Sequence, residues 1–512
     1  MEKSFKKLSL AFDIVSIYIL AAFTLHLFGK YLPMPISHDE SYFVWEGWNF
    51  LKGETPYVDF LLKSPVLMFL NAMGIFLFGL KDFHFRIAVL CMVLPSVVLL
   101  YLALRRLGVY GLFAFIVVLH YVTVFFRPSF HDSSINDSEA YAAALAVIGL
   151  AMILWNSRGI QKPFQWTIFV SGFFLALAVL TKEPFVFSGI AIVAVFFIFH
   201  RMSRSNYFGW HLPTVVVGGL TAGLFVFGYL AIRGSFFGYF EAMQINRIYA
   251  KYYVTDLFGI RFNSIAQMIT YDLQKLHANY YNSPILFPLF PFYAAFLWKY
   301  RLSFFTLVNV IGVLLGAYGI SMGHFHATHY QLIGTVGLLL PAIYGALWLS
   351  DFLKGKDIKY LWLMVPFVVL CVISIGQCAQ MAKQGIPKCA WYSYQFPENL
   401  RDPVKRFTGK NDYILLLENP MMYIFLERKH SFRWGLLLDE LIRGYPGDTE
   451  QEKMRLVREE IEKKLPKLIY APPTSQFWAR QQKHLEGVVF PIIRKYGYTD
   501  LGDGIYVLKD KS

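Results

Sequence analysis

The sequence predicts a polytopic α-helical membrane protein with a small α/β domain at its C-terminal end. Of its 512 residues, 56% are hydrophobic and only 16% are charged, and the mean hydropathy is +0.44. A soluble domain carries about 25% charged residues. Long apolar segments also alternate with short connections that contain basic residues. Most of this chain is therefore expected to lie in lipid rather than in water.

Eleven apolar segments are predicted to be membrane-spanning helices, because a helix needs roughly 20 apolar residues to cross the hydrocarbon core. These segments are residues 9–28, 84–104, 109–126, 138–156, 165–181, 184–200, 211–232, 284–298, 303–322, 330–349 and 359–379. Together they predict a transmembrane module of about 11 helices over residues 1–384.

Basic residues lie in every second connection, which predicts the orientation of the chain. The clusters are Lys3, Lys6 and Lys7; Arg105 and Arg106; Arg158 and Lys162; Arg201 and Arg204; Lys299 and Arg301; and Lys354, Lys356 and Lys359. Cytoplasmic loops of membrane proteins carry an excess of such residues. The N-terminus is therefore predicted to be cytoplasmic and the C-terminus extracytoplasmic. The net charge of +14 is explained by these loops, so no nucleic-acid partner is expected.

The remaining connections are predicted to lie outside the cytoplasm, at residues 29–83, 127–137, 233–283 and 323–329, with a tight turn at 181–184. The first of them contains the apolar stretch Val66–Phe78, which is short for a span. A crossing there would also put Arg105 and Arg106 on the wrong side of the membrane. We therefore expect Val66–Phe78 to be a helix at the membrane surface.

From residue 385 the composition becomes that of a soluble domain, which predicts an extracytoplasmic α/β domain over residues 385–512. The expected elements are strands at Asp412–Glu418, Lys467–Ala471 and Ile505–Leu508, and a charged helix at Glu450–Lys464.

The four cysteines show no spacing typical of a metal site. Cys91 and Cys371 lie in apolar segments and are expected to pack in the protein interior. Cys378 and Cys389 form a disulfide only if their segment is extracytoplasmic, and the sequence leaves that pairing open.

The first outside loop begins with an acidic pair, Asp39 and Glu40, directly after the first predicted span. Carboxylates are costly to hold near hydrocarbon unless they are paired, hydrated or bound to a metal. A carboxylate there could act as a general base on an acceptor hydroxyl, or bind a divalent cation that bridges a phosphate. The structural alternative is that Asp39 caps the helix that follows. These two residues alone leave both interpretations open.

Further charged residues occur in the same set of loops. Lys63 is placed to hold a phosphate as a point charge, or to extend its ammonium to the lipid headgroups. Asp137 and Glu139 begin a predicted span, where one acidic residue is explained by the helix N-terminus. Lys182 and Glu183 occupy the tight turn, as an interfacial pair or as a cation for a phosphate leaving group.

A histidine cluster, His324, His326 and His329 followed by Tyr330, suggests a metal site. The spacing does not place three imidazoles on one helical face, and structural zinc sites bring closer, paired ligands. Polar contacts to a substrate or a lipid headgroup are therefore favoured over zinc. The sequence identifies no required cofactor and leaves open whether catalysis uses a divalent cation.

In chain order these features resemble the GT-C class of integral-membrane glycosyltransferases. The nearest resemblance is to bacterial members related to dolichyl-phosphate-mannose protein mannosyltransferases (family 39) and to the lipid A aminoarabinose transferase (family 83). The matching segments are Asp39-Glu40, Gly53–Asp59, Lys63-Ser64-Pro65, Leu77-Phe78-Gly79, Leu180–Pro184 and His329–Leu332. Ser64 replaces a proline of that pattern and Glu183 replaces a glycine, which weakens the assignment of Lys182 as a phosphate ligand.

The resemblance implies a GT-C fold and transfer of a sugar, with inversion, from a polyprenyl-phosphate donor to an acceptor outside the cytoplasmic membrane. Undecaprenyl is the lipid implied for most bacteria. Asp39 would be the general base, assisted by Glu40, and Lys63 and Lys182 would bind the donor phosphate. The remaining implied site residues, which would position the acceptor or a metal, are Asp137, Glu139, His329 and Tyr330. No Gly-rich nucleotide loop follows a predicted strand in the N-terminal part.

Three other functions compete with this one. A lipid transporter or flippase would show inverted repeats and acidic residues within its spans, whereas the charges here concentrate in loops. A polymerase or ligase of surface polysaccharide shares the donor class but usually lacks a soluble C-terminal domain. A binding protein that uses residues 385–512 would leave Asp39 without a role. The sugar stays open, as does the acceptor, for which a protein hydroxyl, lipid A, a glycolipid and a cell-wall glycan all suit an outside site.

Overall fold

The computed structural model describes most of the helices and the C-terminal region. The described residues are 2–34, 36–61, 63–126, 135–156, 166–193, 208–252, 290–300, 332–354, 397–417, 420–433, 447–471 and 483–509, with a few isolated positions between them. The chain consists of two compact units. The first comprises Met1–Met34, Lys81–Val226 and Phe262–Cys389, and the second comprises Pro35–Leu80, Phe227–Arg261 and Ala390–Ser512.

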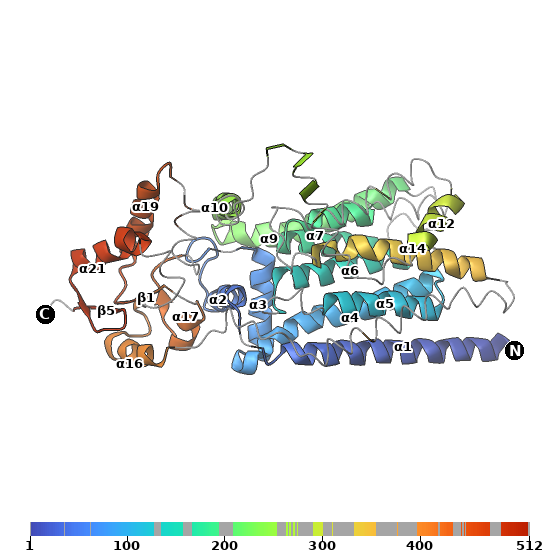
Figure 1. Ribbon diagram of the computed structural model, residues 1–512, viewed down its shortest axis with the longest axis horizontal. Helices are drawn as coiled ribbons and strands as arrows, with labels where there is room; N and C mark the ends of the chain where they lie inside the picture. The colour runs from blue at the N-terminus through green and yellow to red at the C-terminus, as the bar shows by residue number, and fades with distance from the viewer. Residues whose placement is uncertain are drawn as a thin grey trace. The chain divides into compact units, whose positions relative to one another are not determined.

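The first unit is a bundle of helices (Figure 1). Its helices are α1 (Glu2–Tyr31), α4 (Ile87–Leu107), α5 (Gly111–Phe125), α6 (Ser138–Asn156), α7 (Trp166–Thr181), α9 (Phe208–Ile232, whose end belongs to the second unit), α12 (Phe290–Tyr300) and α14 (Thr335–Leu353), preceded at α4 by the short 3₁₀ turn η1 (Lys81–Arg86). Helix α4 contacts α1, α5 and α6, and α14 contacts α5, α6 and α12.

Five helices of the described chain are long and apolar enough to cross a membrane. They run over Leu8–Tyr31, Lys81–Leu107, Ser138–Trp155, His211–Ile232 and Leu332–Leu353. Each coincides with one of the predicted spans. Shorter apolar helices lie at Pro65–Phe78, Gly111–Phe125 and Trp166–Thr181. The predicted spans at 303–322 and 359–379 fall almost wholly outside the described residues, so the number of about 11 helices stays a prediction.

Burial separates inner from outer helices of this bundle. The apolar windows of α6 and α14 are 89% and 94% buried, whereas those of α1 and α9 are 17% and 28% buried. The outer helices carry large apolar side chains on their exposed faces, such as Tyr18 and Leu224. Such surfaces suit lipid rather than water. Cys91 is also exposed, on α4, so the expectation that it packs in the interior is wrong.

Helices α7 and α9 approach each other through two glycines. A Cβ atom on Gly172 would lie 2.0 Å from the carbonyl oxygen of Val215, and one on Gly218 would lie 2.0 Å from that of Phe169. Any larger side chain would push the backbones apart. Small residues at such contacts are a common device of membrane helix packing, since they allow close van der Waals contact and short polar distances.

Arg86 connects the two ends of the first loop through hydrogen bonds. Its buried guanidinium donates through Nη1 to the carbonyl oxygens of Tyr31, Leu32 and Met34, at 3.0, 2.8 and 2.7 Å. The last carbonyls of a helix have no partner within the helix, and a cation is favourable at that end. Because Tyr31, Leu32 and Met34 lie at the start of the loop and Arg86 follows its end, this side chain ties the two ends of the loop together. The sequence alone gives no sign of this role for Arg86.

Replacing Arg86 with methionine is expected to destabilise the first unit by about 3 kcal/mol, since several buried carbonyls lose their donor. Thermal unfolding in detergent should show a clearly lower Tm. Arg106→Met is the matched control, because Arg106 donates to one carbonyl, that of Trp155, at an exposed position. Equal Tm values for the two variants would contradict the structural role assigned to Arg86.

The second unit joins the first loop to the C-terminal region. From the loop come α2 (His38–Leu51) and α3 (Pro65–Phe78), and α10 (Phe236–Tyr252) comes from the segment after α9. The C-terminal elements are α16 (Glu398–Phe407), β1 (Tyr413–Leu416), α17 (Met421–Leu426), β2 (Lys429–His430), α19 (Glu450–Lys463), β3 (Leu468–Tyr470), the π-helical turn η8 (Leu485–Val489), α21 (Phe490–Tyr496), β4 (Tyr498–Asp500) and β5 (Ile505–Leu508).

The five strands form one mixed sheet in the order β2-β1-β3-β5-β4. Strand β1 is parallel to both β2 and β3, while β5 is antiparallel to β3 and β4. The three predicted strands and the predicted charged helix are confirmed as β1, β3, β5 and α19. Strand β2 has only two residues and β4 is half exposed, so neither carries a period-two apolar signal. The predicted domain boundary at residue 385 stays a prediction.

Candidate functional site

The acidic pair lies in the first turn of α2. Ser37 is the N-cap of this helix, and its side chain accepts a hydrogen bond from the amide of Glu40 at 3.1 Å. The alternative in which Asp39 caps the helix is therefore wrong. Successive residues of a helix point about 100° apart, and the two carboxylates differ accordingly. The Asp39 side chain is 52% exposed, whereas Glu40 is completely buried.

Asp39 forms an ion pair with Lys63, the basic residue that the sequence placed at the end of the same loop. The Lys63 Nζ atom is 3.1 Å from Asp39 Oδ1. The ammonium also lies 5.6 Å from the ring centre of Tyr42 and 5.4 Å from that of Phe43. Cations over aromatic rings are attracted by the ring quadrupole. The predicted base and the predicted phosphate ligand are thus neighbours, 24 residues apart in sequence.

The backbone at Lys63 is fixed by α2. The Lys63 amide donates to Glu46 Oε1 at 3.0 Å, and the hydroxyl of Tyr42 donates to the carbonyl of Leu61 at 2.7 Å. Asp39, Tyr42 and Glu46 follow a helical spacing, so one face of α2 makes these contacts. The backbone that carries the Lys63 side chain is therefore held in a defined position.

Helix α3 begins beside this segment and packs closely on α2. Ser64 caps α3 by accepting the amide of Leu67 at 3.2 Å. A Cβ atom added to Gly47 of α2 would lie 2.7 Å from the amide nitrogen of Ala72 in α3. Glycine at this position lets the two helices approach each other closely.

Glu46 is the residue of this site that sequence reasoning missed. It is completely buried. Burial raises the pKa of its carboxyl well above the usual value near 4.5, while the amide and charge of Lys63 lower it. Desolvation outweighs them because it penalises the ionised form of a fully buried carboxyl. The only signal in the sequence is its place seven residues after Asp39, on the same face of α2.

The raised pKa of Glu46 predicts a pH-dependent stability. The neutral Glu46 side chain contributes fully to the free energy of unfolding below pH 4.5, the pKa of this carboxyl in the unfolded chain. This contribution is lost as the pH rises toward the higher pKa of the folded state. Glu46→Gln cannot ionise, so its Tm in detergent should fall less than that of the wild type between pH 4.5 and alkaline pH. Glu459→Gln, at an exposed position, is the control. Parallel curves for the wild type and Glu46→Gln would contradict this assignment.

A second charged cluster lies in the first unit. Lys182 Nζ is 2.7 Å from Glu139 Oε1, and Ser138 donates to the other carboxylate oxygen at 2.7 Å. The Glu139 side chain is 3% exposed. Asp137 precedes α6 and its carbonyl accepts the amide of Tyr141 at 3.3 Å. Two residues predicted for different roles, Lys182 for the phosphate and Glu139 for the acceptor or a metal, are therefore paired with each other.

The histidine motif falls outside the described residues, so the predicted roles of His329 and Tyr330 stay predictions. The same is true of the predicted pairing of Cys378 and Cys389. Within the described part of the chain, no group of three His, Cys, Asp or Glu side chains is arranged to hold a metal ion. The role of a divalent cation stays open.

The second unit contains a cavity of 490 Å³ between the end of α2 and the C-terminal sheet. Volumes of this size are typical of small-ligand sites. Its walls carry three carboxylates, each in contact with a basic side chain: Glu54 with His430, Asp59 with Lys464, and Glu427 with Lys410. Lysines and an arginine outnumber these carboxylates on the walls. Sequence reasoning had no signal for this cavity, since its two walls are far apart in the chain.

The chain was compared with known proteins. No protein-family model matches the sequence, and no characterised protein matches it by sequence. Several solved structures share its fold, and three of them are compared with it below. ArnT from Cupriavidus metallidurans in the apo state gives a TM-score of 0.51 at 13% identity, over 92% of this chain and 94% of that one. ArnT bound to undecaprenyl phosphate gives 0.50 at 12% identity, over 100% and 99%.

The third structure is the apo form of the oligosaccharyltransferase from Archaeoglobus fulgidus. It gives a TM-score of 0.51 at 13% identity, over 98% of this chain and 75% of that one. At such identities the likeness establishes the fold alone. The chain therefore has the fold of GT-C membrane glycosyltransferases, which its ordered motifs predicted. With its long apolar helices, this fold makes the chain a membrane protein.

Proposed function

We propose that this protein is a membrane glycosyltransferase that moves a sugar from a polyprenyl-phosphate donor to an acceptor outside the cytoplasm. The observation that carries the proposal is the ion pair between Asp39 and Lys63, with 3.1 Å between Oδ1 and Nζ, at the start of α2. One partner suits a general base and the other suits a phosphate ligand. The fold shared with ArnT supports a transfer reaction of this class.

The proposed reaction is a single inverting displacement. Asp39 accepts the proton of an acceptor hydroxyl, and the acceptor oxygen forms a bond to the anomeric carbon from the face opposite the phosphate. The bond between the anomeric carbon and the phosphate oxygen breaks, and its electrons leave with the polyprenyl phosphate. Lys63 stabilises the negative charge that develops on this leaving group. Asp39 is half exposed, so an acceptor can reach its carboxylate.

The ion pair suggests how donor and base would interact. The Lys63 ammonium contacts the Asp39 carboxylate. A donor phosphate brings a second anion to the same ammonium and so competes with Asp39 for it. Binding of the donor then weakens the hold of Lys63 on the base, and an Asp39 oxygen becomes available to the acceptor hydroxyl.

The other predicted site residues receive supporting roles in this proposal. Glu40 is completely buried, which suits a residue that positions α2 better than one that exchanges protons. Lys182 already has a carboxylate partner in Glu139. We assign Lys182, with Lys63, to the donor phosphate. We assign Glu139, with Asp137, His329 and Tyr330, to the acceptor or a divalent cation.

The lipid proposed for the donor is undecaprenyl, because a structure of ArnT with this fold is bound to undecaprenyl phosphate. The proposed orientation has a cytoplasmic N-terminus and an extracytoplasmic C-terminus, supported by the basic residues in alternate connections. A reporter fused after Ser512 should therefore be active only outside the cytoplasm.

The test uses the purified full-length protein in nanodiscs with a set of radiolabelled undecaprenyl-phosphate sugars and membrane extract as acceptor. Glycosyl transfer or slow donor hydrolysis is expected with at least one sugar. If none is consumed, the proposal fails. In sealed vesicles, movement of an intact donor between leaflets would indicate a flippase instead. Repeated extension of one product chain would indicate a polysaccharide polymerase.

A further inference from the structure

The backbone segment that leads to Lys63 is held by the C-terminal α/β region as well as by α2. Three contacts join the two, each well separated in sequence. They are His430 Nε2 with Glu54 Oε2 at 2.8 Å, Lys464 Nζ with Asp59 Oδ1 at 3.4 Å, and the amide of Leu61 with the carbonyl of Arg433 at 2.7 Å. The third contact is only two residues before Lys63.

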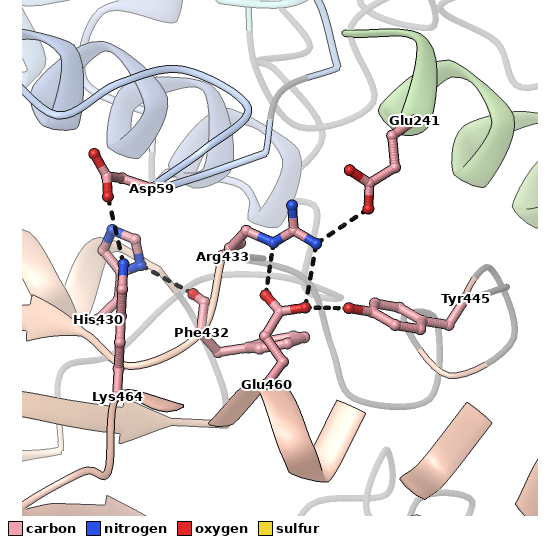
Figure 2. A network of polar contacts seen from close by, with 8 residues as sticks. All are labelled: Asp59, Glu241, His430, Phe432, Arg433, Tyr445, Glu460 and Lys464. Carbon is pink, nitrogen blue, oxygen red and sulfur yellow. Dashed lines mark hydrogen bonds and ion pairs between the residues drawn. The ribbon is translucent and has the colours of Figure 1, made fainter. Parts of the chain in front are cut away.

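Arg433 is itself fixed on two sides, as Figure 2 shows. Its Nε and Nη2 atoms donate to the two carboxylate oxygens of Glu460, at 2.7 and 3.2 Å, and Nη2 also donates to Glu241 at 3.1 Å. The hydroxyl of Tyr445 donates to the same Glu460 carboxylate. The Arg433 side chain is 20% exposed and that of Glu460 is 13% exposed. Paired, partly buried contacts of a guanidinium fork are strong and directional.

These partners come from different parts of the second unit. Glu460 belongs to α19 and Glu241 to α10. Just before Arg433, the amide of Ser431 donates to the carbonyl of Ile414 in β1 at 2.9 Å. The backbone carbonyl of Arg433 is thus anchored by the sheet on one side and by its own side chain on the other. These contacts oppose movement of the carbonyl away from Leu61.

The consequence for Lys63 follows from the nature of its side chain. A lysine ammonium sits on a flexible four-carbon stem, so its position depends on how firmly the backbone is held. Glu46 of α2 holds the Lys63 amide, and Arg433 of the C-terminal region holds the amide of Leu61. A misplacement of about 1 Å in a catalytic group can lower a rate by about 10²-fold.

We propose that Arg433 is a positioning residue, which acts through the backbone of Leu61 to keep the Lys63 ammonium where the donor phosphate binds. This inference rests on the proposed function of Lys63, although the contact with Leu61 can be tested without it. It assigns to the C-terminal α/β region, and to α10 through Glu241, a direct influence on the donor side of the site.

The first measurement is hydrogen exchange of a peptide that contains Leu61, in the full-length protein in nanodiscs. Arg433→Met removes the contacts to Glu460 and Glu241, so exchange of this peptide should rise by about tenfold as the local contact opens more often. Arg433→Lys, which keeps the charge, should give an intermediate rise. An unchanged exchange rate in Arg433→Met would overturn the inference even if the protein is an active glycosyltransferase.

The second measurement is the affinity for undecaprenyl phosphate, in two backgrounds. Arg433→Met should weaken binding by about tenfold when Lys63 is present, a coupling of the size seen for residues of one contact network. In a Lys63→Gln background, Arg433→Met should cause no further loss. Equal losses in both backgrounds would mean that Arg433 supports the fold in general, and would overturn the positioning role.

Arg455→Met is the matched control. Arg455 lies on the same helix as Glu460, and its guanidinium pairs with Glu459 at 2.7 Å on an exposed surface. This variant should change neither exchange at Leu61 nor lipid affinity. If the wild type does not bind undecaprenyl phosphate while exchange at Leu61 responds to Arg433→Met, the proposed function is refuted and the mechanical link between Arg433 and Leu61 stands.

Discussion

Replacing Asp39 with asparagine is expected to lower kcat for sugar transfer by about 10³-fold, within the range found for the loss of a general base. Asparagine has the same shape but cannot accept the proton of the acceptor hydroxyl. The apparent affinity for the donor should not fall with kcat and should instead stay equal or rise. Lys63 then no longer contacts an anionic Asp39, so its ammonium is more available to the donor phosphate. A lower kcat with an equal or lower KM for the donor is the expected result.

Glu462→Gln is the matched control for this experiment. Glu462 also lies in the second unit, its side chain is 18% exposed, and it too pairs with a lysine, Lys495. Loss of a lysine-paired carboxylate as such would affect both variants alike. If Asp39→Asn keeps full activity, or if Glu462→Gln loses as much activity as Asp39→Asn, Asp39 is not the base.

Replacing Lys63 with glutamine is expected to lower kcat by about 10²- to 10³-fold, as for the loss of one group that stabilises a charge developing in the transition state. The KM for the donor should rise at the same time, because the phosphate carries charge before the reaction as well. Lys63→Arg keeps the charge but changes its shape and reach, so it should recover part of kcat. Initial rates at varied donor concentration give both quantities.

Lys495→Gln controls for the loss of a lysine from the second unit. Lys495 is 57% exposed and pairs with Glu462 at 2.9 Å, in the C-terminal region. Its substitution should leave both kcat and KM unchanged. The two main variants are also expected to change donor binding differently. Lys63→Gln should weaken it, whereas Asp39→Asn should not. If both variants raised the KM for the donor, the roles proposed for Asp39 and Lys63 would be contradicted.

Helices were predictable where an apolar segment is long, or where apolar residues recur at helical spacing after a capping residue. The spans at 9–28, 84–104 and 138–156 each meet a long apolar helix of the structure. The charged helix from Glu450 was predictable as well, since its apolar residues recur at helical spacing and Thr449 caps it. The two-residue strand β2 was not predictable, because its existence depends on pairing with β1 rather than on its own residues.

The site was predictable only as a set of residues. The sequence indicated Asp39 and Lys63 as site candidates, because of their residue types and their places in one loop. It did not decide whether Asp39 instead caps the helix that follows. The hydrogen bond from Glu40 to Ser37 decided that question. Glu46 could not be recognised in advance, because nothing in a row of residues shows that a carboxyl will be buried against the amide of Lys63.

The sequence by itself determined the long apolar helices of this membrane protein and the charged helix of its C-terminal region, because hydropathy and the placement of charge are properties of single segments. Tertiary structure alone decided which charges meet. Lys182 pairs with Glu139 in the first unit. In the second, Arg433 joins Glu460 and Glu241 beside Leu61. Ion pairs depend on distances of a few ångströms between residues far apart in sequence, and only the packing of helices and sheet sets those distances.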